Sequence, residues 1–207
     1  MLNNKVVKAG SWYTLTNFFV TGISFLTLPI FTRILSTSDY GITSVYSSYV
    51  SIFSIVFSLD LVGVVQRAKF DFKDDYDRFI SSTLFLALLS FAIFSGVMIV
   101  FNGFFSEALG LEKWLLYFAL IHSFFLFVQN FVFAKFGVEY NYRKISMVQI
   151  TNSIVGVLLS IVLILFVFNN KRYFGRILGT ALPIIVSGFI LLAYIFIRGR
   201  KLINKTY

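Results

Sequence analysis

Six long apolar segments limit what this chain can fold into. The first two cover 11–35 and 42–66, and the short polar turn STSDYG joins them. At about 1.5 Å rise per residue, a helix of either length crosses a hydrocarbon core about 30 Å thick. The other segments are 79–101, 114–136, 145–168 and 175–197. We therefore predict an all-α integral membrane protein, a six-transmembrane-helix bundle that forms one domain over residues 1–207.

The composition supports this fold class and excludes several functions. Hydrophobic residues make up 58% of the chain, and its 27 Phe and 11 Tyr suit lipid-facing surfaces and interfacial belts. The absence of cysteine excludes disulfides and thiolate metal sites. No Ser/His/Asp set, Gly-rich phosphate loop or metal-ligand spacing occurs. We therefore expect neither an enzyme nor a bound metal or cofactor.

Lysine and arginine predict the orientation of the helices. If the amino terminus is cytoplasmic, thirteen of the 18 Lys and Arg fall in inner segments and five in outer ones. Cytoplasmic loops of membrane proteins carry such an excess, so we expect a multi-pass protein with both termini in the cytoplasm. The net charge of +9 then reflects orientation and contact with anionic lipid, and we expect no nucleic-acid partner.

Polar side chains recur at helical spacing along three of the segments. These rows are Thr14, Asn17, Thr21 and Ser24; Ser44, Ser47, Ser51, Ser54 and Ser58; and Gln149, Asn152, Gly156 and Ser160. Steps of three and four residues place each row on one side of its helix. Two interpretations stay open: close helix packing through small residues, and the wall of a hydrated cavity. In the cavity, Asn17, Gln149 and Asn152 are candidate substrate-binding residues.

Two arginines lie at the predicted outer ends of their helices. Arg33 ends the first segment and Arg176 begins the sixth. Either side chain can extend to the headgroups without a protein partner. If they point inward instead, they form a cationic rim for a phosphate-bearing substrate, because a guanidinium can donate two parallel hydrogen bonds to such a group.

Asp60 and His122 are ionisable residues inside the segments, where a charge is costly and usually faces a partner or water. Asp60 either pairs with a nearby basic residue or serves as a cation or proton site for ion coupling. His122 either packs with a hydrogen bond or acts as a proton switch. Because Gln129 lies on the same face of the helix and Asn130 is next to it, we include all three among the candidate substrate-binding residues.

Pro29 and Pro183 lie within the first and sixth segments. Each removes a backbone hydrogen bond, so we expect each to bend or locally break its helix and predict a hinge there. The alternative is that proline is simply more frequent in membrane helices than in soluble ones.

The charged stretch RAKFDFKDDYDR, residues 67–78, is predicted to be a loop in water. Its acidic residues are Asp71, Asp74, Asp75 and Asp77. In membrane prenyltransferases such carboxylates hold magnesium and a diphosphate. Those enzymes use a second acidic motif on another inner loop, where this chain has Glu139 alone. The interleaved Lys and Arg favour a self-neutralised loop.

The first two segments resemble a known family. The order SWYTLTNFF, LPIFTRILSTSDYG and VVQRAKFDF is similar to the amino-terminal half of bacterial polysaccharide flippases. These are the Wzx-type lipid-linked oligosaccharide translocases of the MATE-like multidrug/oligosaccharidyl-lipid/polysaccharide exporter superfamily. The resemblance is strongest over residues 11–83, and its more specific part is Pro29, Arg33, Asp39, Tyr40 and Gly41. Helix count and loop lengths extend it to the rest of the chain.

The resemblance implies a fold, a substrate and partners. The chain would be one lobe of a two-lobe transporter in the bacterial cytoplasmic membrane, with a cationic cavity between two six-helix bundles. The implied substrate is an undecaprenyl-diphosphate-linked oligosaccharide used for O-antigen, capsule or exopolysaccharide, and polysaccharide assembly proteins are implied partners. The drug-exporting branch commonly relies on an acidic residue in the first helix, where this chain has Asn17 and no acid.

The helix count departs from the family. Its members have about twelve to fourteen helices, so we expect this chain to be a fragment that needs a second six-helix lobe, or to assemble as a homodimer. The alternative function is a non-transporting membrane interaction protein or a truncated remnant. A reading frame that continues beyond Tyr207 with six more helices would favour the flippase.

Overall fold

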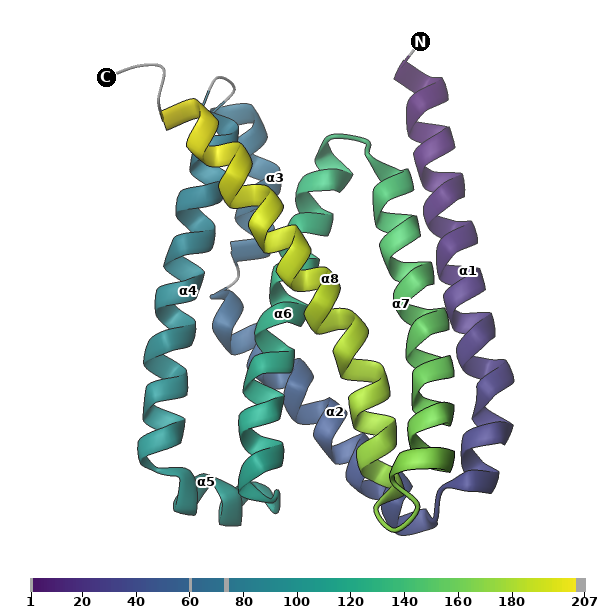
Figure 1. Ribbon diagram of the computed structural model, residues 1–207. Helices are drawn as coiled ribbons and strands as arrows, with labels where there is room; N and C mark the ends of the chain where they lie inside the picture. Colours follow the sequence, from purple (N-terminus) through teal and green to yellow (C-terminus); the bar gives the residue numbers. More distant parts are fainter. Residues whose placement is uncertain (1, 60, 73–74, 204–207) are drawn as a thin grey trace. The chain divides into compact units, whose positions relative to one another are not determined.

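The computed structural model describes residues 2–59, 61–72 and 75–203, and these residues form helices and connecting turns without strands (Figure 1). The helices are α1 (Leu2–Ile34), α2 (Thr37–Ser58), α3 (Leu61–Asp71), α4 (Tyr76–Val100), α5 (Asn102–Leu109), α6 (Lys113–Val138), α7 (Tyr142–Val162), a π-helical turn (Leu163–Val167) and α8 (Arg172–Ile203). Six of the described helical segments are long and apolar enough to cross a membrane. The predicted all-α membrane fold is confirmed.

Several predicted helix bounds lie close to those of the structure. α4 and α6 begin and end within three residues of the predicted segments 79–101 and 114–136. α1 and α8 are longer than predicted, and each helix continues through its proline, Pro29 or Pro183. Neither proline breaks its helix, and their role as hinges stays a prediction.

The second predicted segment, 42–66, differs from the structure at both ends. α2 begins at Thr37 because Ser36 and Asp39 form a capping box. The Asp39 N–H donates to Ser36 Oγ at 3.1 Å, and the Ser36 N–H donates to Asp39 Oδ2 at 3.2 Å. α2 ends before Leu59, whose φ is +43°. A separate helix, α3, then extends to Asp71, so the predicted loop 67–78 is partly helical.

The predicted loop between the third and fourth segments contains the short helix α5. Gly110 ends this helix in the left-handed region, with φ +62°. Its N–H donates to the Glu107 carbonyl at 3.2 Å, and the Leu111 N–H donates to the Ser106 carbonyl at 3.1 Å. Glycine at this position stops a helix because L side chains rarely adopt the conformation.

The described chain forms two compact units. Unit 1 comprises Met1–Val45 and Phe136–Ser187, and unit 2 comprises Tyr46–Lys135 and Gly188–Tyr207. α2, α6 and α8 each contribute residues to both units. That the six long helices form a single lobe stays a prediction.

In unit 1, α1 packs along α7. The hydroxyl of Thr16 donates to that of Ser146 at 2.6 Å, and both residues are buried. The Trp12 ring stacks on Tyr142 with centroids 6.0 Å apart, so the amino-terminal part of α1 lies beside the start of α7. At the other end of α1, the Ile34 carbonyl accepts a hydrogen bond from Arg172 of α8 at 2.8 Å. The first and fifth long helices, α1 and α7, therefore run in the same direction, and the sixth, α8, starts where α1 ends. This is expected when successive helices cross a membrane in alternating directions.

In unit 2, phenylalanine rings join α2, α4 and α6. Phe57 of α2 lies edge-on to Phe91 and Phe94 of α4, with centroid distances of 5.1 and 5.2 Å. Phe91 in turn stacks on Phe124 of α6 at 4.4 Å. Lipid tails are as apolar as these rings, so the contacts stabilise the unit through close packing more than through escape from water.

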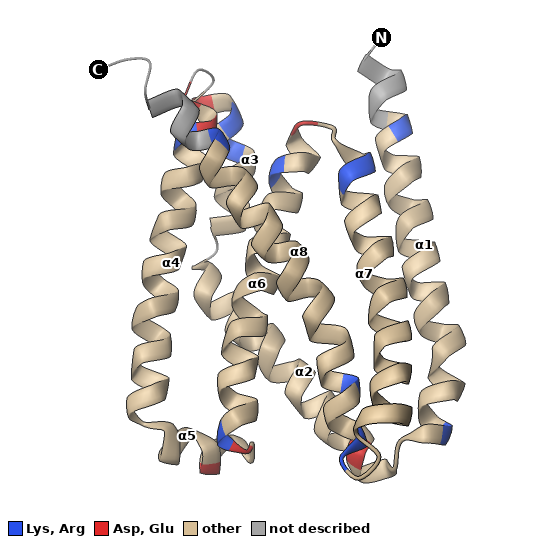
Figure 2. Cartoon of the chain, in the orientation of Figure 1, with Lys and Arg blue, Asp and Glu red and all other residues tan. Residues whose placement is uncertain are grey.

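Charged side chains lie near the ends of the helices, as Figure 2 shows. Lys8 and Arg33 lie toward opposite ends of α1, and Arg143 and Lys144 lie at the start of α7. Between these charged ends, the helical turns of α1 and α7 contain apolar or uncharged polar residues. This distribution is what a bilayer requires, because an unpaired charge in hydrocarbon is costly.

Candidate functional site

Arg176 of α8 is held against an aromatic ring at one end of unit 1. The centre of its guanidinium lies 3.7 Å from the centroid of the Phe31 ring in α1. Its Nη1 donates to the Ser160 hydroxyl of α7 at 3.3 Å. Phe31 is buried against Leu35 and Ile164. A cation over an aromatic face gains about 0.5–2 kcal/mol. Three helices therefore fix the position of this one cation.

Two glycines of α8 allow the close approach that places Ser160 beside Arg176. A Cβ on Gly175 would lie 2.9 Å from the backbone nitrogen of Ile164, in the π-helical turn. One turn later, Gly179 faces the backbone of Ser160 with no room for a Cβ. Small residues at such positions let membrane helices pack backbone to backbone. The Ser160 hydroxyl also lies 2.6 Å from the Gly156 carbonyl, to which it donates.

Further basic residues lie in the last turn of α1 and at the start of α8, and we call the set Arg33, Lys171, Arg172 and Arg176 the basic end of unit 1. Arg33, Lys171 and Arg172 are exposed, whereas Arg176 is half-buried. The acidic residue at this end, Asp39, already accepts hydrogen bonds from Ser36 and from the backbone N–H of Tyr173 at 3.4 Å. The basic end therefore has surplus positive charge.

The Arg176 guanidinium keeps unused donors. The Ser160 bond occupies Nη1, and Nε and Nη2 donate to no residue in the described part of the chain. A guanidinium offers five N–H donors in a planar fork that matches the oxygens of a carboxylate or phosphate. The arrangement can therefore bind an anion while Phe31 holds the flat face of the group. Its predicted partner in the rim, Arg33, lies in the last turn of α1, at the same end of unit 1, and is exposed.

The other candidates in unit 1 lie along α1 and α7. Asn17 is exposed, and Gln149 and Asn152 are half-buried. The Asn152 amide donates to Ser187 Oγ of α8 at 3.0 Å, so part of this polar row joins helices. That observation favours the packing interpretation for Asn152 and leaves the cavity interpretation open for Asn17.

The remaining candidates belong to unit 2. His122 is buried, its Nδ1 lies 3.2 Å from the Tyr46 hydroxyl, and its ring stacks on the Tyr46 ring. Gln129 is buried and Asn130 is exposed, so the two neighbours point to different surroundings. The convergence of these three residues and Arg176 on one cavity stays a prediction. Asp60 lies outside the described residues.

A comparison with protein families matches residues 6–206 to the family described as "Polysaccharide biosynthesis protein". The chain belongs to this family. Comparisons with curated proteins and with solved structures gave no match. The family links the chain to polysaccharide synthesis or export, and the six apolar helices make it a multi-pass membrane protein. The flippase resemblance of the first two segments is consistent with the match.

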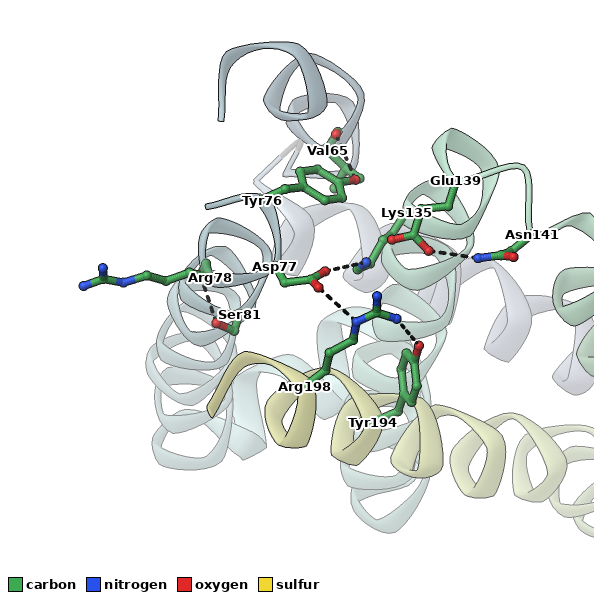
Figure 3. A network of polar contacts seen from close by, with 10 residues as sticks. All are labelled: Val65, Tyr76, Asp77, Arg78, Ser81, Lys135, Glu139, Asn141, Tyr194 and Arg198. Carbon is green, nitrogen blue, oxygen red and sulfur yellow. Dashed lines mark hydrogen bonds and ion pairs between the residues drawn. The ribbon is translucent and has the colours of Figure 1, made fainter. Parts of the chain in front are cut away.

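Unit 2 of this polysaccharide biosynthesis protein contains an ion network that joins three helices (Figure 3). The Asp77 carboxylate of α4 contacts Lys135 Nζ of α6 at 2.7 Å and Arg198 Nε of α8 at 2.9 Å. Arg198 also donates from Nη1 to the Tyr194 hydroxyl at 2.7 Å. Lys135 Nζ lies 5.1 Å from the centroid of the Tyr76 ring. The start of α4 therefore meets the ends of α6 and α8.

The network also bears on the prenyltransferase alternative. Asp77 has both oxygens bound to cations, while Asp71 and Asp75 are exposed. Among the described residues, no group of three or more His, Cys, Asp or Glu could hold a metal ion. Asp74 lies outside the described residues. The geometry of Asp77 is that of a structural ion pair.

Sequence reasoning missed Phe31, Lys135, Tyr194 and Arg198 as members of polar or cationic contacts. Lys135 and Arg198 are charges near predicted helix ends, on the same predicted side of the membrane as Asp77. That shared side was the signal that could have suggested their contact with Asp77. No sequence signal identifies Phe31, because a phenylalanine in an apolar segment looks the same whether it meets lipid or a guanidinium.

Proposed function

We propose that this polysaccharide biosynthesis protein translocates an undecaprenyl-diphosphate-linked oligosaccharide across the bacterial cytoplasmic membrane. The observation that carries the proposal is the Arg176 guanidinium, which is held between Phe31 and Ser160 with unused N–H donors. The diphosphate is the anionic group of such a lipid. It would bind at the basic end of unit 1, where Arg176 supplies a guanidinium held in place and Arg33 an exposed charge.

The sugar part of the substrate requires hydroxyl and amide groups along its path. The exposed Asn17 and Asn130, the half-buried Gln149 and the buried His122 and Gln129 are the side chains we propose for this role. Translocation involves no covalent step. The substrate would favour states open to opposite sides of the membrane in turn, which is possible when it binds the two states with different free energies.

The proposal includes a second bundle. A cavity needs a facing wall, and we propose that a second six-helix lobe or a second copy of this chain supplies it, with other polysaccharide assembly proteins as further partners. Hydrogen bonds within α1 limit the cost of leaving its exposed polar side chains without a facing wall. The hydroxyls of Thr14 and Ser24 donate to the carbonyls four residues earlier, at 3.1 Å each. Such internal bonds satisfy a hydroxyl in lipid.

The test uses the intact gene in a bacterium that depends on it for surface polysaccharide. Arg176→Gln removes the charge and replaces the guanidinium by a shorter, neutral amide. A charge-assisted hydrogen bond contributes about 1.5–3 kcal/mol, so we expect translocation to fall at least about tenfold and lipid-linked glycan to accumulate in the inner leaflet. Arg33→Gln should have a smaller effect in the same direction.

The matched control is Arg143→Gln, which removes an exposed arginine at the start of α7, away from Arg176. It should leave surface polysaccharide unchanged. If Arg176→Gln protein accumulates to normal levels and the surface polysaccharide is also normal, Arg176 does not bind the substrate.

A further inference from the structure

One face of α8 in unit 2 carries residues at steps of three, four and three. They are Gly188, Leu191, Ile195 and Arg198. This spacing places all of them on one side of a helix. The first three are buried, with Leu191 7% and Ile195 2% exposed, whereas Arg198 is exposed. The face of α8 that covers the rest of unit 2 is therefore apolar and ends in a charge.

At Gly188 the two helices α8 and α6 are in close contact. A Cβ on Gly188 would lie 2.9 Å from both the Cβ and the carbonyl oxygen of Phe125. The next residue, Phe189, meets the Phe125 ring edge-on, with centroids 6.3 Å apart. This point fixes the position of α8 through backbone contact. Arg198 lies ten residues further along, about 15 Å at 1.5 Å per residue.

At the other end, Asp77 holds two cations of unequal burial (Figure 3). The Lys135 side chain is 1% exposed, that of Asp77 18% and that of Arg198 48%. Breaking a buried pair leaves a charge without compensation, whereas an exposed pair competes with water and is weakened by salt. The contact between α4 and α6 is therefore durable, and the contact with α8 is easily exchanged.

The apolar stretch between these two points holds α8 less firmly in a bilayer than it would in water. In water, separating Leu191 and Ile195 from their neighbours would cost the hydrophobic free energy of both side chains. In a bilayer, lipid tails replace the lost contacts, and no comparable hydrophobic penalty opposes the separation. The exposed Asp77–Arg198 pair is then the contact that decides whether the carboxyl-terminal end of α8 packs against the rest of unit 2 or separates from it.

We propose that Asp77 and Arg198 form a releasable clasp, and that the carboxyl-terminal end of α8 opens about the Gly188–Phe125 contact when the clasp is broken. Lys135 keeps Asp77 in place in both states, because this ion pair is shorter and more buried than the pair with Arg198. The device belongs to unit 2 alone and does not depend on which substrate the protein carries.

The test measures distances between nitroxide labels by double electron–electron resonance in phospholipid nanodiscs. The chain contains no cysteine, so labelled pairs can be introduced without removing native residues. The clasp pair is Ser82→Cys with Ile197→Cys, on exposed positions of α4 and α8. The pivot pair is Ile121→Cys with Ile190→Cys, on exposed positions of α6 and α8 near Gly188.

We expect Arg198→Gln to shift the clasp pair toward longer distances, raising the ratio of open to closed states by up to about fivefold. Raising the salt concentration to about 1 M should shift the same pair in the protein with Arg198 intact, since screening shortens the reach of an exposed pair to about 3 Å. The pivot pair should not change in either experiment.

The control variant is Arg78→Gln, which removes an exposed arginine from the same end of α4; the Arg78 side chain points away from Asp77 in Figure 3. It should leave both distance distributions as they are. If neither Arg198→Gln nor salt changes the distance distribution of the clasp pair, packing alone holds α8. A pivot pair that moves together with the clasp pair, or an equal response to Arg78→Gln, would equally overturn the proposal.

Discussion

Lys135 and Arg198 share one carboxylate but depend on it to different degrees. Asp77→Asn removes the charge that the buried Lys135 contacts at 2.7 Å. Removing one partner of a buried pair typically costs about 3–5 kcal/mol. Arg198→Gln disrupts a pair whose cation is 48% exposed, and such pairs contribute about 0–1 kcal/mol. We therefore expect Asp77→Asn to lower the free energy of unfolding several times more than Arg198→Gln.

Unfolding by increasing mole fractions of dodecyl sulfate in mixed micelles, followed by circular dichroism, gives both free energies. Arg78→Gln serves as the control at the same helix end and should be close to neutral. Equal losses for Asp77→Asn and Arg198→Gln would mean that Lys135 does not need the carboxylate.

At this scale the sequence predicts which residues are charged but not which of them meet. Asp77 stood in a charged stretch that alternates in sign, and that pattern favours a solvated loop. Its partner Arg198 is 121 positions away, and no local periodicity connects the two. For Arg176 the sequence shows a charge near a helix end, and its binding of substrate stays a prediction. The supporting Phe31 ring becomes visible only in the packing of α1 against α8.

At the scale of helices, the contact between α7 and α8 depends on Gly179. Its missing side chain leaves room for the backbone of Ser160, and a Cβ there would overlap backbone atoms that cannot move independently. Overpacking of this kind costs about 1–3 kcal/mol. We expect Gly179→Ala to destabilise unit 1 by that amount, measured by the same unfolding method, and to weaken Arg176 binding to Ser160 because the two helices separate.

Two glycines provide graded controls for this prediction. A Cβ on Gly156 would meet the Gly179 carbonyl at 3.5 Å, an ordinary contact, and a Cβ on Gly22 meets nothing within 4 Å. Gly156→Ala should cost less than Gly179→Ala, and Gly22→Ala should cost least. Equal effects at the three sites would show that helix propensity, rather than the fit of α7 on α8, dominates.

The sequence predicts the long helices, because the length of each apolar run indicates one, but it predicts their ends less well. The apolar run after α2 continues past Leu59 without Gly or Pro at the break, so the sequence favours one uninterrupted helix where the structure has α2 and α3. In contrast, the early start of α2 had a readable signal. Ser36 followed three residues later by Asp39 is a capping pattern, although the same four residues also suit a turn.

At the scale of the whole molecule, the number of membrane crossings follows from hydropathy, whereas the grouping of helices does not. Each long helix is apolar over most of its surface, so its sequence does not say which side faces lipid and which faces a neighbour. The division of α2, α6 and α8 between the two units is not marked by any break in their apolar pattern. The count of Lys and Arg in the loops predicts the orientation of the helices in the bilayer, but not which helices pack together.

That orientation can be tested across a single helix. Asp71 ends α3 before α4, and Glu107 lies in α5 after it, so α4 is the one predicted crossing between them. The excess of Lys and Arg around Asp71 predicts a cytoplasmic location for this residue and an outer location for Glu107. Both side chains are exposed, so cysteines placed there would be accessible to reagents.

A membrane-impermeant maleimide should therefore label Glu107→Cys in intact cells and Asp71→Cys only after the membrane is permeabilised. The cysteine-free parent supplies the blank, because any signal from it comes from other proteins. If only Asp71→Cys is labelled in intact cells, the topology is the reverse of the predicted one, and the basic end of unit 1 lies in the cytoplasm. Labelling of both would mean that α4 does not cross the bilayer. The basic end lies outside only if Glu107 does, because two predicted crossings separate Arg33 from Glu107 and two more separate Glu107 from Arg176.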